Sequence, residues 1–324
     1  MQQTAEAGHA LRAQHLCVFM LGMLALGGNL YALAEPAQAA RNLISDPEFI
    51  NGFIVEAPSA ESSAGGRGSV EGTRTTPWAS GPPVWHLAQW NSKKSVEAKY
   101  KQSSRDLVTW ENEAKTISIG RPGSTQEGVE SFVNANYEND SQYDTGKLKK
   151  AWANFIWRQK FRDTPVGDVP LAHLSQLPFS AQYKLTAARP VPNAGVGHNL
   201  IFFLIETTKE PHELAYLGLP MYDNRYPVIR RWTGLDHDKH RLIYQLGFED
   251  GYVQGDPRSG EWVNVNVDLL PKISEMLAHG AGRGALSSAD YRDYALTGIT
   301  LNWEVPGLGE FGSKIRRLSL LAVK

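Results

Sequence analysis

Two carboxylate side chains that could act as acid and base lie at the ends of predicted strands. Glu138 and Glu304 each end a strand face that carries polar side chains. Hydrolysis of a glycosidic bond normally needs two carboxyl groups, one of them acting as general acid. We therefore take Glu138 and Glu304 as the candidate catalytic pair and keep Glu111 and Glu206 in reserve. For each of the four, the alternative is a surface charge or a turn ligand.

Amide and indole side chains recur on the same predicted polar faces. In the segment 262–269, valines alternate with Trp262, Asn264 and Asn266, so the two faces of the strand differ. Asparagine is depleted in strands, and its recurrence needs a cause. A sugar ring has an apolar C–H face and a rim of hydroxyls, which calls for aromatic platforms and hydrogen-bonding groups. The alternative is an ordinary solvated face. We predict one shared substrate-binding sheet face formed by Trp152, Asn154, Arg158, Trp262, Asn264, Asn134 and Asn302.

The segment Gly218–Pro227, GLPMYDNRYP, places charged residues between two prolines and two tyrosines. We predict a substrate-binding loop in which Asp223 and Arg225 contact the ligand. Asp-Asn is also good turn chemistry, and an arginine can clamp a carboxylate, so a purely structural turn is the alternative.

Several kinds of chemistry have no support in the sequence. The run Asp236–His240, DHDKH, lacks an established metal-ligand spacing and is interpreted as a solvated turn. Serine-hydrolase, zincin and nucleotide-binding motifs are missing. The only cysteine, Cys17, lies in the N-terminal apolar segment, which excludes thiol chemistry after cleavage of that segment. We predict no metal and no cofactor.

The elements that must position these residues are short segments of period 2, bounded by Gly, Pro, Asn and Asp. Such a pattern predicts an all-β fold, either a sandwich or a barrel. One short helix is predicted at Leu269–Ala278, and a flexible Ser/Gly/Pro-rich loop at 57–83. The predicted strands are Trp85–Trp90, Leu107–Ile119, Glu130–Tyr137, Ala151–Phe161, Phe179–Ala187, Leu200–Thr207, Arg241–Phe248, Trp262–Leu269, Ala295–Val305 and Ile315–Val323.

The N-terminal residues of the 324-residue chain have the pattern of an export signal. Arg12 precedes an apolar run, Leu16–Leu26, and Ala37-Gln38-Ala39 fits a cleavage site. We predict a signal peptide at 1–39, a single domain at 40–324, and a secreted or periplasmic protein without a membrane span after cleavage. An uncleaved anchor is the alternative. The 33 Lys and Arg balance 34 Asp and Glu without a concentrated basic patch, so we expect no nucleic-acid partner.

Three stretches resemble a known group of proteins. RNLISDPEF resembles the first strand of secreted jelly-roll carbohydrate modules, and ITLNWEVPG with KIRRLSLLAVK resembles the last strands of concanavalin-A-like glycan-active sandwiches. The resemblance implies a two-sheet antiparallel β-sandwich of the jelly-roll or concanavalin-A-like kind. Its concave face or rim is expected to meet a poly- or oligosaccharide. The E-x-D-x-x-E strand of laminarinase-type glucanases is absent, so no catalytic residues are carried over. The expected function is that of a glycoside hydrolase or polysaccharide lyase. The alternatives are a non-catalytic carbohydrate-binding module and an adhesive envelope sandwich.

Overall fold

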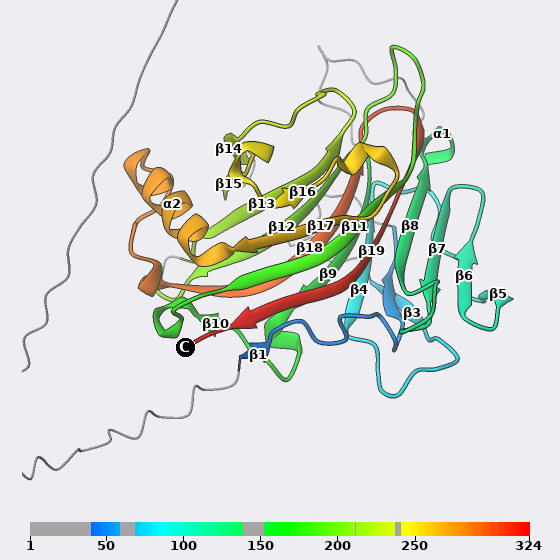
Figure 1. Cartoon of the computed structure of the whole chain (residues 1–324), viewed down its shortest axis with the longest axis horizontal. Helices are drawn as coiled ribbons and strands as arrows, with labels where there is room; N and C mark the ends of the chain where they lie inside the picture. The colour runs from blue at the N-terminus through cyan, green and yellow to red at the C-terminus, as the bar shows by residue number, and fades with distance from the viewer. Residues whose placement is uncertain (1–39, 59–68, 139–151, 211, 237–240) are drawn as a thin grey trace, which may run out of the picture. The chain divides into compact units, whose positions relative to one another are not determined.

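The computed structural model describes residues 40–58, 69–138, 152–210, 212–236 and 241–324. The predicted signal peptide and most of the predicted turn at Asp236–His240 lie outside these residues. The described residues form two β-sheets and two α-helices, α1 (Ala135–Glu138) and α2 (Leu269–Gly282) (Figure 1). None of the helices within these ranges is long and apolar enough to cross a membrane. Short 3-10 turns occupy Phe161–Asp163, Leu171–His173, Phe248–Asp250, Pro257–Ser259 and Tyr291–Asp293.

The first sheet has ten strands, and most neighbours in it are antiparallel. Only the pairs β13/β15 and β2/β4 run parallel. In spatial order the strands are β14 (Trp232–Asp236), β15 (Arg241–Gln245), β13 (Leu214–Asp223), β12 (His198–Thr207), β18 (Tyr294–Val305), β9 (Ala153–Lys160), β4 (Trp85–Trp90), β2 (Phe53–Glu56) and β3 (Val70–Arg74), while β10 (Val169–Pro170) pairs with β18.

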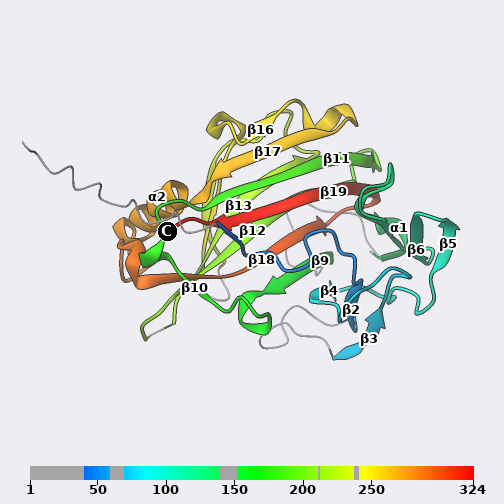
Figure 2. The same cartoon turned by 60° about the horizontal axis from the view of Figure 1, so that its bottom comes forward.

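The second sheet has nine strands, and Figure 2 shows its central strands lying over those of the first sheet. All of its pairs are antiparallel. In spatial order the strands of this sheet are β16 (Val253–Gln254), β17 (Val263–Asp268), β11 (Pro178–Pro190), β19 (Gly309–Ala322), β8 (Gly128–Asn134), β7 (Lys115–Gly120), β6 (Leu107–Glu111) and β5 (Lys101–Ser104), while β1 (Arg41–Asn42) pairs with β19.

The facing sides of the two sheets form one hydrophobic core. The alternation of apolar residues along each strand directs one side chain in two into this layer. The ring of Phe179 in β11 meets that of Phe203 in β12 at a centroid distance of 5.0 Å. The Trp303 ring in β18 lies 5.8 Å from that of Phe311 in β19. The predicted all-β, two-sheet sandwich is therefore confirmed.

Two buried indole groups also connect the sheets through hydrogen bonds. Trp157 Nε1 in β9 donates to Ser131 Oγ in β8 at 2.7 Å, and Trp303 Nε1 in β18 donates to Ser313 Oγ in β19 at 2.9 Å. A buried N–H without an acceptor costs free energy, so each serine allows a tryptophan to fill the core.

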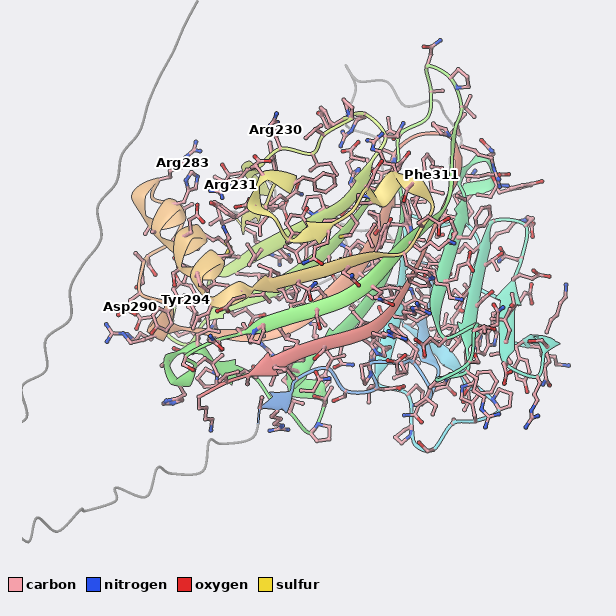
Figure 3. All side chains as sticks on the ribbon, viewed as in Figure 1. Arg230, Arg231, Arg283, Asp290, Tyr294 and Phe311 are labelled. Atoms are coloured by element: carbon pink, nitrogen blue, oxygen red, sulfur yellow. The ribbon has the colours of Figure 1, made fainter. Side chains whose placement is uncertain are left out.

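Helix α2 begins at the predicted residue and extends past the predicted end. Asp268 caps it by accepting from Leu270 N, and the helix continues through Gly280 to Gly282. Helix α2 is fixed to the neighbouring segments by Asp250, which accepts hydrogen bonds from Arg231 and Lys272 (Figure 3 labels Arg231).

Two strands lie where the sequence predicted loops. β13 takes up the first part of the predicted loop Gly218–Pro227, and β3 lies inside the segment 57–83. β13 was missed because Pro220 and the Asp223-Asn224 turn residues indicated a loop. The structure accommodates Pro220 at a register shift between β13 and β12.

Candidate functional site

Five side chains form a row across the outer face of the ten-stranded sheet. The pairs Asp223–His198, His198–Glu304, Glu304–Asn154 and Asn154–Trp90 are direct cross-strand neighbours on β13, β12, β18, β9 and β4. Residues opposite each other in antiparallel strands point to the same face. The adjacent residues in the chain, such as Trp303, belong to the core, so this row faces away from the second sheet. We call these five residues the cross-strand row.

Glu304 and His198 form the centre of the row. Glu304 Oε2 lies 3.0 Å from His198 Nε2, and the two side chains are 24% and 15% exposed. Burial raises the pKa of Glu304, but the hydrogen bond and charge of His198, the hydrogen bond of Asn302 and the charge of Arg225 together bring that pKa below its ordinary value. Glu304 is thus held as a partly accessible, ionised carboxylate.

Three buried polar atoms on the same face of β12 and β18 as Glu304 have no hydrogen-bond partner among the described residues. They are His198 Nδ1, Asn302 Oδ1 and Thr300 Oγ1. Thr300, Asn302 and Glu304 alternate along β18, so all three belong to the same outer face. Unsatisfied buried polar atoms are rare because each costs about 1–3 kcal/mol. A ligand rich in hydroxyl groups would supply both donors and acceptors to these atoms.

The β13 end of the row carries the predicted pair Asp223 and Arg225. Arg225 Nε and Nη2 donate to the two carboxylate oxygens of Asp223 at 2.9 Å and 2.6 Å. Asp223 is opposite His198, and the Arg225 charge also lowers the pKa of Glu304. The structure therefore places Asp223 in the row and Arg225 beside it.

Arg158 lies on the same face but is committed to a buried ion pair. It is opposite His86, and its Nε donates to Glu56 Oε1 at 3.1 Å. Burial raises the pKa of Glu56, whereas hydrogen bonds from His86 and Arg158 lower it further than burial raises it. We therefore assign Arg158 a structural role in the sheet, next to the cross-strand row. Trp152 directly precedes β9; its carbonyl accepts from Asn154 Nδ2, and its Nε1 is buried without a partner in the described residues.

Trp262, Asn264 and Asn134 do not share this face, so the expectation of a single polar face was wrong. Asn264 and Asn134 belong to β17 and β8 of the nine-stranded sheet, and Trp262 directly precedes β17. The Arg316 guanidinium covers the Trp262 ring, with Cζ 4.0 Å from its centroid. Asn264 Oδ1 accepts from Gln182 Nε2 at 3.0 Å. Alternation separates the two faces of each strand but does not say which sheet the strand joins.

Glu138 is not on the cross-strand row either. The chain leaves β8 at Asn134 and makes the helical turn α1, which takes Glu138 off the predicted polar strand face. Its Oε1 lies 2.8 Å from Lys115 Nζ, its Oε2 accepts from Lys93 N at 2.7 Å, and the side chain is fully buried. We assign Glu138 a structural role. The reserves Glu111 and Glu206 form ion pairs with Lys101 and Arg162.

Sequence reasoning missed His198, Thr300 and Trp90 as members of the site. His198 begins the apolar strand β12, where a histidine is ordinarily a satisfied core residue. Its importance comes from the register that sets it against both Glu304 and Asp223. Within the described ranges, no group of three or more His, Cys, Asp or Glu side chains could hold a metal ion.

The comparisons with known proteins give weak structural likenesses. No protein-family model and no curated protein matches the chain. Among solved structures, a family 12 xyloglucanase from Bacillus licheniformis aligns with a TM-score of 0.40 and 8% identity, covering 74% of this chain and 99% of that one. An endoglucanase from Rhodothermus marinus gives a TM-score of 0.37 at 12% identity, covering 68% and 93%. A family 11 xylanase from Neocallimastix patriciarum gives 0.36 at 9% identity, covering 73% and 100%. TM-scores this low support no functional conclusion, so the function is argued from the side chains.

Proposed function

We propose that the cross-strand row binds a polysaccharide and that Glu304 takes part in cleaving it, as a glycoside hydrolase or polysaccharide lyase. The observation that supports this most is the set of unpartnered buried atoms on His198, Asn302 and Thr300, which belong to the same sheet face as an ionised carboxylate. Hydroxyl groups of a sugar chain complement such atoms, and Trp90 adds an aromatic side chain at the β4 end.

The chemistry assigned to Glu304 follows from its ionised state. A carboxylate of lowered pKa serves as nucleophile or base and not as general acid. Asp223 is the second carboxyl of the row, and its strand lies two inter-strand spacings from β18, about 10 Å. In inverting glycosidases the two carboxyl groups lie about 6.5–9.5 Å apart and one of them is the general acid. Asp223 takes that role only if a bound substrate releases it from Arg225.

A second candidate function is binding without cleavage. The bidentate ion pair with Arg225 occupies both oxygens of Asp223, and Glu304 is ionised. Neither carboxyl group is therefore arranged as a proton donor. A non-catalytic carbohydrate-binding module needs no such donor, which favours this alternative.

Cleavage and binding assays on a polysaccharide panel test the proposal. The wild type, Glu304→Gln and a control variant are each tested on carboxymethyl cellulose, xylan, laminarin, alginate and pectin. The control is Glu111→Gln, on the nine-stranded sheet. We expect the wild type and the control to cleave one polymer, and Glu304→Gln to bind that polymer with at least about 100-fold slower cleavage. Binding of a polymer without cleavage would support the second candidate. Failure of the wild type to bind or cleave any of these polymers contradicts both.

We also propose that the protein is exported after cleavage of residues 1–39. The apolar run Leu16–Leu26 and the Ala37-Gln38-Ala39 motif support this. N-terminal sequencing of the exported protein is expected to begin near Ala40, or near Glu35 if Ala32-Leu33-Ala34 is used. A mature cytoplasmic protein that still begins at Met1 would exclude export by this signal.

A further inference from the structure

An exposed tyrosine lies next to the β13 end of the cross-strand row. Tyr226 follows Arg225 in the chain, and its side chain is one of the few large apolar groups that are exposed, at 52%. Its backbone N–H donates to Asp223 O at 3.3 Å. The tyrosine is thus tied directly to the last residue of the row.

Two arginines fix the position of Tyr226. The Arg225 guanidinium lies over one face of its ring, with Cζ 5.3 Å from the centroid, while both carboxylate oxygens of Asp223 hold the same arginine. Arg258 Nη2 bonds to the carbonyl oxygens of Tyr226 and Asp223, the latter at 2.6 Å. Arg258 in turn lies over the Tyr222 ring at 5.3 Å. The exposed ring is therefore held by a network of contacts that anchors its backbone and covers one of its faces.

A pre-positioned aromatic ring at the end of a polar row suits a sugar chain. The C–H face of a pyranose stacks on an aromatic ring, and a ring that is already ordered loses little entropy on binding. Because β13 lies two strands from β18, Asp223 is about 10 Å of backbone away from Glu304. A sugar on Tyr226 is therefore a different unit of the chain from the one at Glu304.

We propose that Tyr226 is a stacking platform for a sugar unit bound beyond Asp223, so that the ligand is a chain of several units and not a mono- or disaccharide. This inference rests on the proposed function and specifies its ligand. The platform acts on binding of long chains only, because a short ligand placed at Glu304 does not reach it.

Calorimetry with oligosaccharides of two and six units, prepared from whichever panel polymer the wild type binds, tests this inference. The variants are Tyr226→Ala, Tyr226→Trp and the matched control Tyr137→Ala, whose side chain is 51% exposed on helix α1. We expect Tyr226→Ala to weaken binding of the six-unit ligand about 10-fold and leave the two-unit ligand unchanged. Tyr226→Trp and Tyr137→Ala are expected to stay within about twofold of the wild type for both ligands, since the first keeps an aromatic platform.

The outcomes separate this inference from the proposed function. If the wild type binds the six-unit ligand and Tyr226→Ala behaves like Tyr137→Ala, the platform is disproved and the proposed function stands. Equal weakening of binding for the two-unit and six-unit ligands also disproves the platform. Tyr226 would then act on the sugar units next to Glu304, or the substitution would disturb the fold. If the wild type binds no panel polymer, the proposed function fails and the inference with it.

Discussion

Glu304 on β18 and His198 on β12 face each other across the sheet, with Oε2 and Nε2 3.0 Å apart. The contact joins the one partly exposed acidic side chain at the centre of the row to a histidine whose other ring nitrogen is buried without a partner in the described residues. It determines which protonation state of Glu304 a ligand would meet.

Replacing His198 by glutamine should shift the titration of Glu304. Burial raises the pKa of Glu304, and the His198 hydrogen bond is the foremost influence that lowers it. Without the hydrogen bond and charge of the imidazole, the effect of burial is less opposed, so the pKa of Glu304 should rise. Carbon-13 NMR titration of the carboxyl group measures this, with His212→Gln, which changes a histidine paired with Glu210, as control. An unchanged or lower pKa in His198→Gln would show that the contact does not stabilise the ionised form.

The same contact affects stability at low pH. Because the pKa of folded Glu304 is lowered, the carboxylate contributes stability above its unfolded-state pKa, and that contribution is lost as the pH falls through the folded-state value. His198→Gln should therefore lose less stability than the wild type across this acidic range. Urea unfolding at a series of pH values provides the measurement.

Removing Lys115 should strongly destabilise the fold. Its ammonium group lies 2.8 Å from Glu138, both side chains are buried, and Lys115 Nζ also donates to Gln89 at 3.1 Å. Lys115→Met leaves an unpaired buried carboxylate, and we expect a loss of about 3–5 kcal/mol in the free energy of unfolding. The double variant Lys115→Met/Glu138→Leu should recover much of this loss. A single-variant loss under about 1 kcal/mol in urea unfolding would mean that the pair is not buried as described.

The Trp303–Ser313 hydrogen bond should contribute measurably to sheet-to-sheet packing. Ser313→Ala removes the acceptor of the buried indole N–H, and the expected loss is about 1–3 kcal/mol. Ser319→Ala, on the outer side of the same strand, is the control and should change stability by less than about 0.5 kcal/mol. Equal losses in the two variants would show that replacing any serine of this strand destabilises the fold, and that the hydrogen bond to Trp303 is not the cause.

Substituting Trp262 should leave glycan binding unchanged. Its ring packs under Arg316 beside the nine-stranded sheet, away from Glu304. Trp262→Ala should lower the free energy of unfolding by about 0.5–1 kcal/mol through loss of the cation–π contact. Affinity electrophoresis on the bound polymer should show no change in mobility relative to the wild type. A marked loss of binding would move the ligand to the second sheet and contradict the assignment of the site.

Strands that alternate clearly, and the fully apolar run Leu200–Ile205, were predictable from the sequence. Trp85–Trp90 was placed to the residue, and β9, β12, β17 and β18 differ from their predicted ends by at most two residues. β13 was not recognised because Pro220 and the Asp223-Asn224 turn residues indicated a loop. Glu138 was assigned to a strand because Ala135 and Tyr137 continue the alternation, although the chain turns there into a helical turn.

The candidate site was predictable in part for a related reason. Asn154, Asn302 and Glu304 were correctly grouped on one face. Each alternates with apolar residues along its own strand, which places it on the polar face of that strand. Trp262 met the same criterion but belongs to the other sheet. Pairing between distant strands, which brings His198 to Glu304 over 106 positions, depends on register and sheet order, and a single strand carries no record of either.

The location of a bound sugar chain tests the central claim most directly. A crystal structure of Glu304→Gln soaked with a six-unit oligosaccharide of the bound polymer should show sugar hydroxyls within hydrogen-bonding distance of Asn302 Oδ1 and His198 Nδ1. The chain should cross β18 and β12 towards Asp223, following the cross-strand row. A sugar chain bound instead on the nine-stranded sheet beside Trp262, with the Asn302 and His198 atoms left without a ligand, would contradict the account.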